Sequence, residues 1–280
     1  MSAGVMIVVL CGAALHALWN TLVKAAADTW VSTALVAGGA AVVAALALPF
    51  LPAPAPASWL HIAVSAVLQG VYFGLVAAAY RAADMSFAYP LMRGTAPVLV
   101  ALVSLPVLGE ALSPPVWAGV GLISAGVLTM IAGRRGPGGR GLRAAGLSLA
   151  NALVIALYSL NDGVGVRLSG SPAGYTLWIY LLGGIPVVAW VAATRRAAFA
   201  AGLRRGWKRG LGGGAANTAS YALALWAMTR APVASVAALR ESAILFGLVI
   251  ATLVLHERLT PPRVAATGLI VAGAVAMRLG

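Results

Sequence analysis

Charge is scarce in this chain of 280 residues, and acidic charge is scarcest. Charged side chains make up 9% of the sequence and only six of them are acidic, whereas a soluble domain carries about 25%. The three histidines and one cysteine show no metal-ligand spacing, and the sequence has no phosphate-binding loop and no nucleophile and base pair. It therefore predicts neither a metal nor a cofactor, and Cys11, a small apolar packing residue, has no partner for an internal disulfide.

Hydrophobic residues make up 61% of the chain, more than a soluble domain of this size could bury. They form recurrent runs of about 20 residues, each long enough to cross a bilayer as a helix and too continuous for barrel strands. The prediction is an all-α integral membrane protein with ten transmembrane helices. The expected spans are 3–25, 30–51, 59–82, 86–108, 113–133, 144–167, 173–194, 208–230, 233–255 and 261–279.

The two halves of the sequence resemble each other at an offset of 147 residues. Without a gap, Tyr89 to Gly126 lies over Val236 to Gly273. The residues that coincide include Arg93 with Arg240, Glu110 with Glu257, Pro114 and Pro115 with Pro261 and Pro262, Gly121 with Gly268, and Gly126 with Gly273. Because each half has an odd number of spans, five, the second half should be inverted relative to the first. The expected units are a first repeat at 1–133, a basic loop at 134–143 and a second repeat at 144–280.

The net charge of +13 lies in short clusters between the spans, which favours membrane orientation over nucleic-acid binding. Fourteen lysines and arginines fall on one side of the predicted membrane and three on the other. The rich side should be cytoplasmic, so the loops at 134–143 and 195–207 lie inside the cell and both termini lie outside. The N-terminus lacks a basic leader and a cleavage site, so the first span should be retained in the cytoplasmic membrane.

Two segments at equivalent places in the halves resemble a family signature. LGEALSPPVWAGVGLISAGV and LHERLTPPRVAATGLIVAGA resemble the closing segment of each half in EamA-type transporters of the drug/metabolite transporter superfamily. The resemblance implies a ten-helix exporter or exchanger of small metabolites that works by alternating access. Helices 1–4 and 6–9 would then surround a cavity, with helices 5 and 10 outside it. Many relatives keep their termini in the cytoplasm, unlike the orientation predicted here.

Polar and aromatic residues recur at helical spacing on four spans, where a lipid-facing stripe would be plain aliphatic residues. We expect these stripes to face inward and to bind the substrate. They contain His16, Trp19, Asn20, Gln69, Tyr72, Tyr80, Tyr158, Asn217 and Tyr221. Trp19 and Tyr80 also align loosely with aromatic amino-acid exporters of the superfamily, although both would equally suit an interfacial belt. His16 is either a hydrogen-bonded packing residue or a proton carrier.

Two arginines lie well inside predicted spans, where a charge costs at least about 2.5 kcal/mol. Arg240 has Glu241 and Asp162 as candidate partners for an ion pair or gate, whereas no acid matches Arg93 in depth. An unbalanced Arg93 would suit a substrate carboxylate or phosphate, which a guanidinium holds through two parallel bonds. The alternatives for Arg93 are snorkelling to the interface and capping of carbonyls freed by Pro97.

Glu110 and Glu257 each stand at a span end before a Ser-Pro-Pro or Thr-Pro-Pro segment, which indicates a structural turn, with proton coupling as the alternative. Gly121 and Ala125, with their counterparts Gly268 and Ala272, form small-residue stripes for helix packing, so the protein is a monomer or a dimer through the fifth and tenth spans.

The predicted function is secondary transport, most consistent with export, of a small metabolite such as an amino acid or another carboxylate, with a proton as a candidate coupling ion. The alternatives are a transporter of phosphonates or other organic anions and an intramembrane enzyme using Asp162, His16 and Glu241. The predicted partners are the substrate and the lipid bilayer, without nucleic acid.

Overall fold

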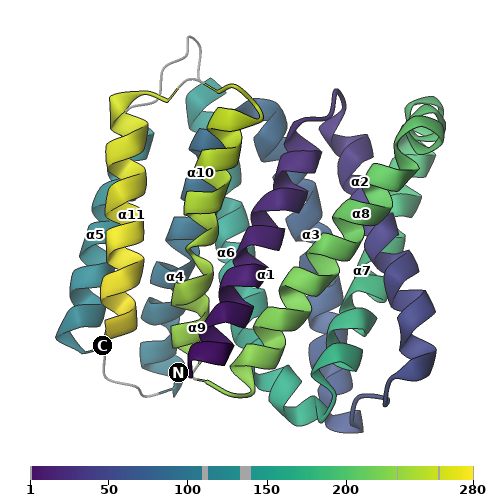
Figure 1. Ribbon diagram of the computed structural model, residues 1–280, viewed down its shortest axis with the longest axis horizontal. Helices are drawn as coiled ribbons and strands as arrows, with labels where there is room; N and C mark the ends of the chain where they lie inside the picture. Colours follow the sequence, from purple (N-terminus) through teal and green to yellow (C-terminus); the bar gives the residue numbers. More distant parts are fainter. Residues whose placement is uncertain (1, 109–112, 133–139, 232, 258, 280) are drawn as a thin grey trace.

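Helices make up nearly all of the part of the chain that the computed structural model describes, residues 2–108, 113–132, 140–231, 233–257 and 259–279 (Figure 1). The helices are α1 Ala3–Lys24, α2 Thr29–Ala47, α3 Trp59–Ala82, α4 Met85–Leu108, α5 Pro114–Ala132, α6 Arg140–Ser169, α7 Pro172–Thr194, α8 Arg196–Met228, α9 Val233–Arg240, α10 Ala243–Leu253 and α11 Pro261–Leu279. Short 3₁₀ turns at Leu48–Phe50 and Pro56–Ser58 join α2 to α3. The all-α prediction is confirmed.

Two predicted spans differ from the structure. The span expected at 208–230 begins at Arg196, so most of the basic residues assigned to a loop form the first turns of α8 instead. The span expected at 233–255 is interrupted at Glu241 and Ser242, which separate α9 from α10. The polar residues Arg240, Glu241 and Ser242 stand at this break in an otherwise apolar segment, and the predicted span continued across them because its mean hydropathy is high.

Local sequence explains where several helices begin. Asp28 caps α2 because its Oδ1 accepts hydrogen bonds from the amides of Trp30 and Val31, at 2.9 and 3.2 Å. Ser171 caps α7 in the same way, and Pro172 follows it at the first helical position. Gly170, with φ of 64°, lies in the left-handed region that lets the chain turn between α6 and α7.

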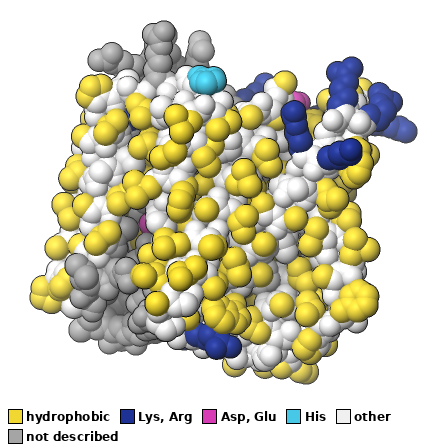
Figure 2. Space-filling model, in the orientation of Figure 1, with side chains coloured by type: hydrophobic (Ala, Val, Ile, Leu, Met, Phe, Trp, Pro, Cys, Tyr) yellow, Lys and Arg dark blue, Asp and Glu magenta, His cyan; other side chains and the backbone are white. Residues whose placement is uncertain are grey.

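Five helical segments of the described residues are long and apolar enough to cross a membrane. They are Ala3–Lys24, Thr29–Phe50, Pro56–Ala82, Gly141–Ser169 and Pro172–Thr194, with shorter apolar helices at Trp117–Thr129 and Ala243–Leu253. Large hydrophobic side chains cover the outer surface, among them Phe50 at 86% exposure and Leu60 at 73% (Figure 2). Such an apolar exterior suits lipid and not water.

The helices form one bundle with α5 and α11 packed together at one side (Figure 1). Elsewhere α1 packs on α8 and α10, α3 on α6 and α7, α4 on α6, and α2 on both α7 and α8. The chain termini lie at the same end of the bundle in Figure 1. This arrangement surrounds a centre to which most of the helices contribute side chains.

Glycines set the closest helix contacts. A Cβ at Gly126 would come within 2.7 Å of the carbonyl oxygen of Ala266, so this glycine and not Gly121 lets α5 approach α11. Space is open around Gly121 and around Gly268, so both glycines of the predicted packing stripes face away from the α5–α11 contact. These two glycines therefore do not make the α5–α11 contact, and the predicted packing of the stripes against another molecule stays a prediction.

Replacing Gly214 by alanine should lower the stability of the bundle by about 1–3 kcal/mol, because its Cβ would overlap the backbone of Gly39 and Ala40 on α2. Gly212 on the same helix is the matched control, since nothing lies within 4 Å of a Cβ there and alanine favours a helix. The thermal unfolding midpoints of the two variants in detergent provide the measurement. Equal midpoints would show that the α2–α8 contact is looser than described.

Candidate functional site

All thirteen candidate residues are at most 5% exposed, so the expectation that their stripes face inward is confirmed. Six aromatic rings from five helices follow one another across the centre of the bundle. Their centroids are 5.4 to 6.2 Å apart, mostly edge to face, as quadrupoles of aromatic rings prefer. In order they are His16, Trp19, Tyr72, Tyr158, Tyr221 and Tyr180.

Hydrogen bonds hold the α1 end of this aromatic row. The Tyr80 hydroxyl donates to Asn20 Oδ1 at 2.7 Å, and Asn20 Nδ2 donates to the carbonyl oxygen of His16 at 2.9 Å. Trp19 Nε1 lies 3.4 Å from His16 Nδ1, which accepts its hydrogen bond. Trp19 and Tyr80 are therefore buried parts of the centre and not members of an interfacial belt, the alternative considered for both.

The α8 end of the row is tied to α7. The Tyr180 hydroxyl donates to Asn217 Oδ1 at 3.0 Å. Gln69 is buried on α3, three residues before Tyr72 and on the same helical face. The predicted residues of α1, α3, α6 and α8 thus contribute to one continuous interior.

Arg93 forms an ion pair with Glu241, with 2.8 Å between Nη2 and Oε1 and both side chains almost fully buried. The prediction that Arg93 has no acid at its depth is therefore wrong. The reason is the break after α9: Glu241 lies outside the regular helix assumed from the sequence, and its carboxylate reaches α4. The pair satisfies two charges that would each be costly alone in a bilayer.

Arg240 makes no ion pair with any described residue, and its guanidinium carbon lies 5.2 Å from the ring centroid of Tyr221. This cation–π contact replaces the predicted ion pair with Glu241 or Asp162. The Tyr221 hydroxyl in turn donates to Asp162, so the ring lies between the cation and that acid. The Arg240–Asp162 gate predicted from the sequence is therefore corrected to an indirect link through Tyr221.

Asp162 is a completely buried carboxylate at the meeting point of four helices. It accepts hydrogen bonds from Ser65 of α3, Asn161 of its own helix, Tyr175 of α7 and Tyr221 of α8. Several donors to a single buried carboxylate compensate the loss of its hydration. Ser65 was not among the predicted site residues, although Ser65 precedes Gln69 by four residues on the same helical face.

Several polar atoms in the centre have no hydrogen-bond partner among the described residues. They are His16 Nε2, Tyr89 Oη, Arg93 Nε, Asn151 Oδ1, Asn217 Nδ2 and Glu241 Oε2. Tyr89 was also missed, although it is one helical turn before Arg93, and its ring stacks on His16 with centroids 6.2 Å apart. Buried polar atoms normally form a hydrogen bond with the protein, water or a ligand. These six residues, together with Asp162, Tyr221 and Arg240, are called the central polar cluster. Because so many of its polar atoms lack a partner, this cluster is the candidate site.

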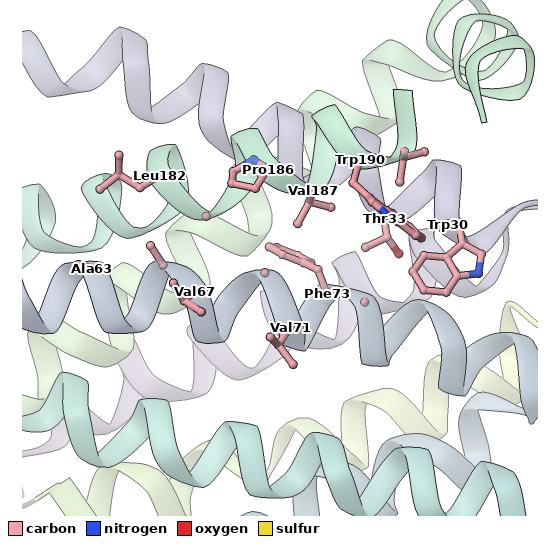
Figure 3. Close-up of a pocket in the computed structure, with 15 residues that line it drawn as sticks. Trp30, Thr33, Ala63, Val67, Val71, Phe73, Leu182, Pro186, Val187 and Trp190 are labelled. Carbon is pink, nitrogen blue, oxygen red and sulfur yellow. The ribbon is translucent and has the colours of Figure 1, made fainter. Parts of the chain in front are cut away.

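The cavities at the periphery do not coincide with this cluster. One of them is a groove of about 690 Å³ between α2, α3 and α7, lined largely by apolar side chains (Figure 3). Among the described residues, no three His, Cys, Asp or Glu side chains gather as metal ligands would. The candidate site is therefore the closed polar interior and not the open apolar groove.

Glu257 has a structural contact that crosses the bundle. Its two carboxylate oxygens accept hydrogen bonds from the amides of Met85 and Ser86, each at 2.9 Å, at the beginning of α4. A carboxylate at a helix N-terminus satisfies free amides and interacts well with the helix dipole. Glu110, its counterpart in the first half, lies outside the described residues.

Arg93→Met and Glu241→Met should each destabilise the protein by about 3–5 kcal/mol, because each leaves a buried charge without its partner. The double variant should lose much less than the sum of the single losses, which a double-mutant cycle of unfolding free energies in detergent measures. Arg263 and Asp84 are the control pair: they lie 3.1 Å apart on the surface, where such pairs contribute about 0–1 kcal/mol. Additive losses at Arg93 and Glu241 would contradict the buried ion pair.

A family model for the EamA-like transporter family matches the chain twice, over residues 3–132 and 142–279. A solved structure titled only "Crystal structure of protein" is similar to the whole chain, with a TM-score of 0.69, 21% sequence identity and 98% of that chain covered, which shows a shared fold. No curated protein matches the sequence. The chain therefore belongs to the EamA-like transporter family and is a membrane transporter of small molecules.

Proposed function

We propose that the protein is a secondary transporter that exports a small metabolite bearing a carboxylate, with an amino acid as the preferred class, across the cytoplasmic membrane by alternating access. The observation that carries the proposal is the buried Arg93–Glu241 ion pair at the break between α9 and α10. Ionisable groups inside a membrane are costly and are typically found along substrate or ion pathways. Here they meet aromatic rings and unpartnered polar atoms in the middle of the chain's interior.

The packing of the helices supports an inverted repeat of residues 1–133 and 144–280. The contact of α1 with α8 has its counterpart in that of α6 with α3, and α2 contacts its own counterpart α7. This exchange of partners is expected when a two-fold axis in the membrane plane relates the two halves. The family model matches each half of the chain separately, which agrees with a repeat.

The interrupted ninth span supports a site near the middle of the membrane. Transporters often bind substrates where a helix is discontinuous, because its free backbone groups and dipoles act on a ligand there. Arg240 closes α9 and Glu241 precedes α10, so each charge stands at the helix end that favours it. A small rearrangement at this break would change which partners the two charges contact.

A carboxylate substrate would compete with Glu241 for Arg93. The guanidinium can hold a carboxylate through two parallel hydrogen bonds, and the Nε of Arg93 has no partner among the described residues. Displaced Glu241 would then take up a proton or bind a substrate ammonium group, which accounts for a proton as the coupling ion. Arg240, which contacts the Tyr221 ring and forms no ion pair with a described residue, offers a second site for the same carboxylate.

Two alternatives are weaker on the same geometry. Two buried guanidinium groups would also suit a phosphonate or another organic anion, but Glu241 would repel a second negative charge. An intramembrane enzyme using Asp162 as a base is disfavoured because four side chains donate to that carboxylate, and Nδ1 of His16 accepts from Trp19.

Arg93→Ala should weaken substrate binding by about 10- to 100-fold, the effect of losing a charge-assisted hydrogen bond. Arg93→Lys should stay impaired because an ammonium group lacks the planar fork, and Glu241→Gln should bind substrate while losing its dependence on a proton gradient. The measurements are binding and flux in proteoliposomes with a panel of amino acids and organic anions. Arg204→Ala is the control, since Arg204 is exposed on α8.

Folding of each variant is checked separately by thermal unfolding. If Arg93→Ala folds, binds and transports as the unchanged protein does, Arg93 only packs the interior and the proposed site is wrong. If no compound of the panel is transported while the protein is folded, the carboxylate class is wrong.

The proposed orientation places the start of α8 in the cytoplasm and both termini outside. The side chains of Lys and Arg visible in Figure 2 gather mostly at the end where α8 begins, in keeping with the excess of positive charge on the inner side. The exposed Ala53 lies in the connection between α2 and α3, which we assign to the outside.

Cysteine labelling tests this orientation in a Cys11→Ser background. A membrane-impermeant maleimide should label Ala53→Cys in intact cells and Arg204→Cys only after permeabilisation, because both side chains are exposed at opposite ends of the bundle. The reverse pattern would invert the orientation without affecting the proposed site.

Dimerisation through α5 and α11 stays a prediction. The small residues Gly121, Ala125, Gly268 and Ala272 leave no close contact inside the bundle and are exposed on the outer faces of these helices. Cross-linking in membranes decides between a monomer and a dimer.

A further inference from the structure

We propose that the protein binds one anionic phospholipid, with an acyl chain in the groove between α2, α3 and α7 and the phosphate in a basic pocket at the groove's end. This lateral groove is lined by the residues around Trp30, Val67, Phe73, Leu182 and Trp190 (Figure 3). It is separate from the central polar cluster, and the proposal does not depend on the transported substrate.

The chemistry of the groove fits a hydrocarbon chain. Apart from Thr33 and the two indoles, its lining side chains carry no polar atom, so it could not orient a polar metabolite. Its volume of about 690 Å³ is within the range of roughly 300–1,000 Å³ typical of ligand pockets. Val67 and Val71 on its rim are 69% and 48% exposed, on a surface that faces lipid.

A basic pocket of about 360 Å³ follows the groove along the same helices. On α3 the groove reaches Gly74 and the pocket contains Tyr80 and Arg81; after α7 the pocket contains Arg195. The Arg195 guanidinium lies 5.9 Å from the ring centroid of Trp30, which lines the groove. The two hollows are therefore neighbours, and Trp30 and Trp190 line the groove at one end with rings 5.1 Å apart (Figure 3).

The charges of the pocket favour a phosphate. Lys24, Arg81 and Arg195 line the pocket together with one acid, Asp28, which pairs with Arg195 at 3.2 Å; Glu257 and Asp84 lie near Lys24 outside the pocket. Lys24 donates to the carbonyl oxygens of Tyr80 and Ala83, which leaves one of its three N–H groups for a ligand. Arg81 is exposed and has no partner among the described residues. Basic pockets between membrane helices commonly bind anionic headgroups.

Neither part of the site would suffice by itself. A free phosphate would leave the groove unused, and a neutral lipid would leave the excess positive charge of the pocket uncompensated. An amphiphile with an anionic head and an apolar tail matches both hollows and their order along α3 and α7. In a membrane protein, anionic phospholipid is the abundant compound with this chemistry.

The test uses the full chain, purified and delipidated in mild detergent. Phosphatidylglycerol should raise the thermal unfolding midpoint and be retained in native mass spectrometry severalfold better than phosphatidylcholine with the same acyl chains, and inorganic phosphate should do neither. Equal effects of the two lipids, or the same shift with inorganic phosphate, would overturn the proposal.

Substitutions separate the headgroup from the tail. Arg81→Gln and Arg195→Gln should each weaken phosphatidylglycerol binding about fivefold and phosphatidylcholine binding much less, because the choline cation compensates the phosphate charge of the second lipid. Asp28→Asn is the matched control for Arg195→Gln, since it removes the same ion pair but keeps the cation, and asparagine can still cap α2. Binding by Asp28→Asn should not fall, and a loss as large as that of Arg195→Gln would contradict a phosphate contact.

Gly70→Leu should weaken the binding of both lipids, because the leucine side chain would fill the groove. A Cβ at this position has space around it, since its nearest neighbour is Val187 at 4.0 Å. Gly121→Leu, on the outer face of α5 where nothing lies within 4 Å, is the control and should bind lipid normally. Unchanged lipid binding by Gly70→Leu would exclude the groove as the acyl-chain site.

Discussion

The interior of this protein depends on the cost of a charge that is removed from water. Arg93 is buried on α4 and Glu241 in the break between α9 and α10, far apart in the sequence, and each is stable there because the other is 2.8 Å away. Their pair fixes α4 against the break between α9 and α10. The other buried charges of the centre are also compensated by neighbouring groups. Asp162 accepts hydrogen bonds from four donors, and Arg240 forms a cation–π contact with the ring of Tyr221.

The same cost bears on the alternating access that we propose. An ion pair between two protein side chains can be exchanged for pairs with a ligand or a proton at small net cost, because the charges remain compensated. The row of aromatic rings from His16 to Tyr180 lies in the same buried interior as these charges. In such an interior the effective dielectric constant is lower than in water, which strengthens electrostatic contacts. The break at Glu241 and Ser242 supplies the backbone freedom that a continuous helix would lack.

The outer surface, like the interior, carries few charged side chains. Among the described residues, most lysines and arginines lie near helix ends or in the first half of α8, while aliphatic and aromatic side chains are exposed on the outer surface. Glycines at Gly39, Gly210 and Gly214 allow α2 and α8 to approach so closely that backbone meets backbone. Where α2, α3 and α7 do not meet, an apolar groove remains open beside a basic pocket.

The sequence by itself determined most of the helices, the inward stripes and the interior position of Arg93 and Arg240, because hydropathy and helical periodicity are local properties. Only the tertiary structure decided which charges meet. Sequence reasoning assigned Glu241 to Arg240, its neighbour in the chain, whereas the broken helix gives it to Arg93. A partner across the bundle depends on the relative rotation and height of two helices, and one residue of shift turns a side chain by about 100°. The rotation and height of each helix are set by the packing of the whole bundle. This information is not present in the sequence of any single segment.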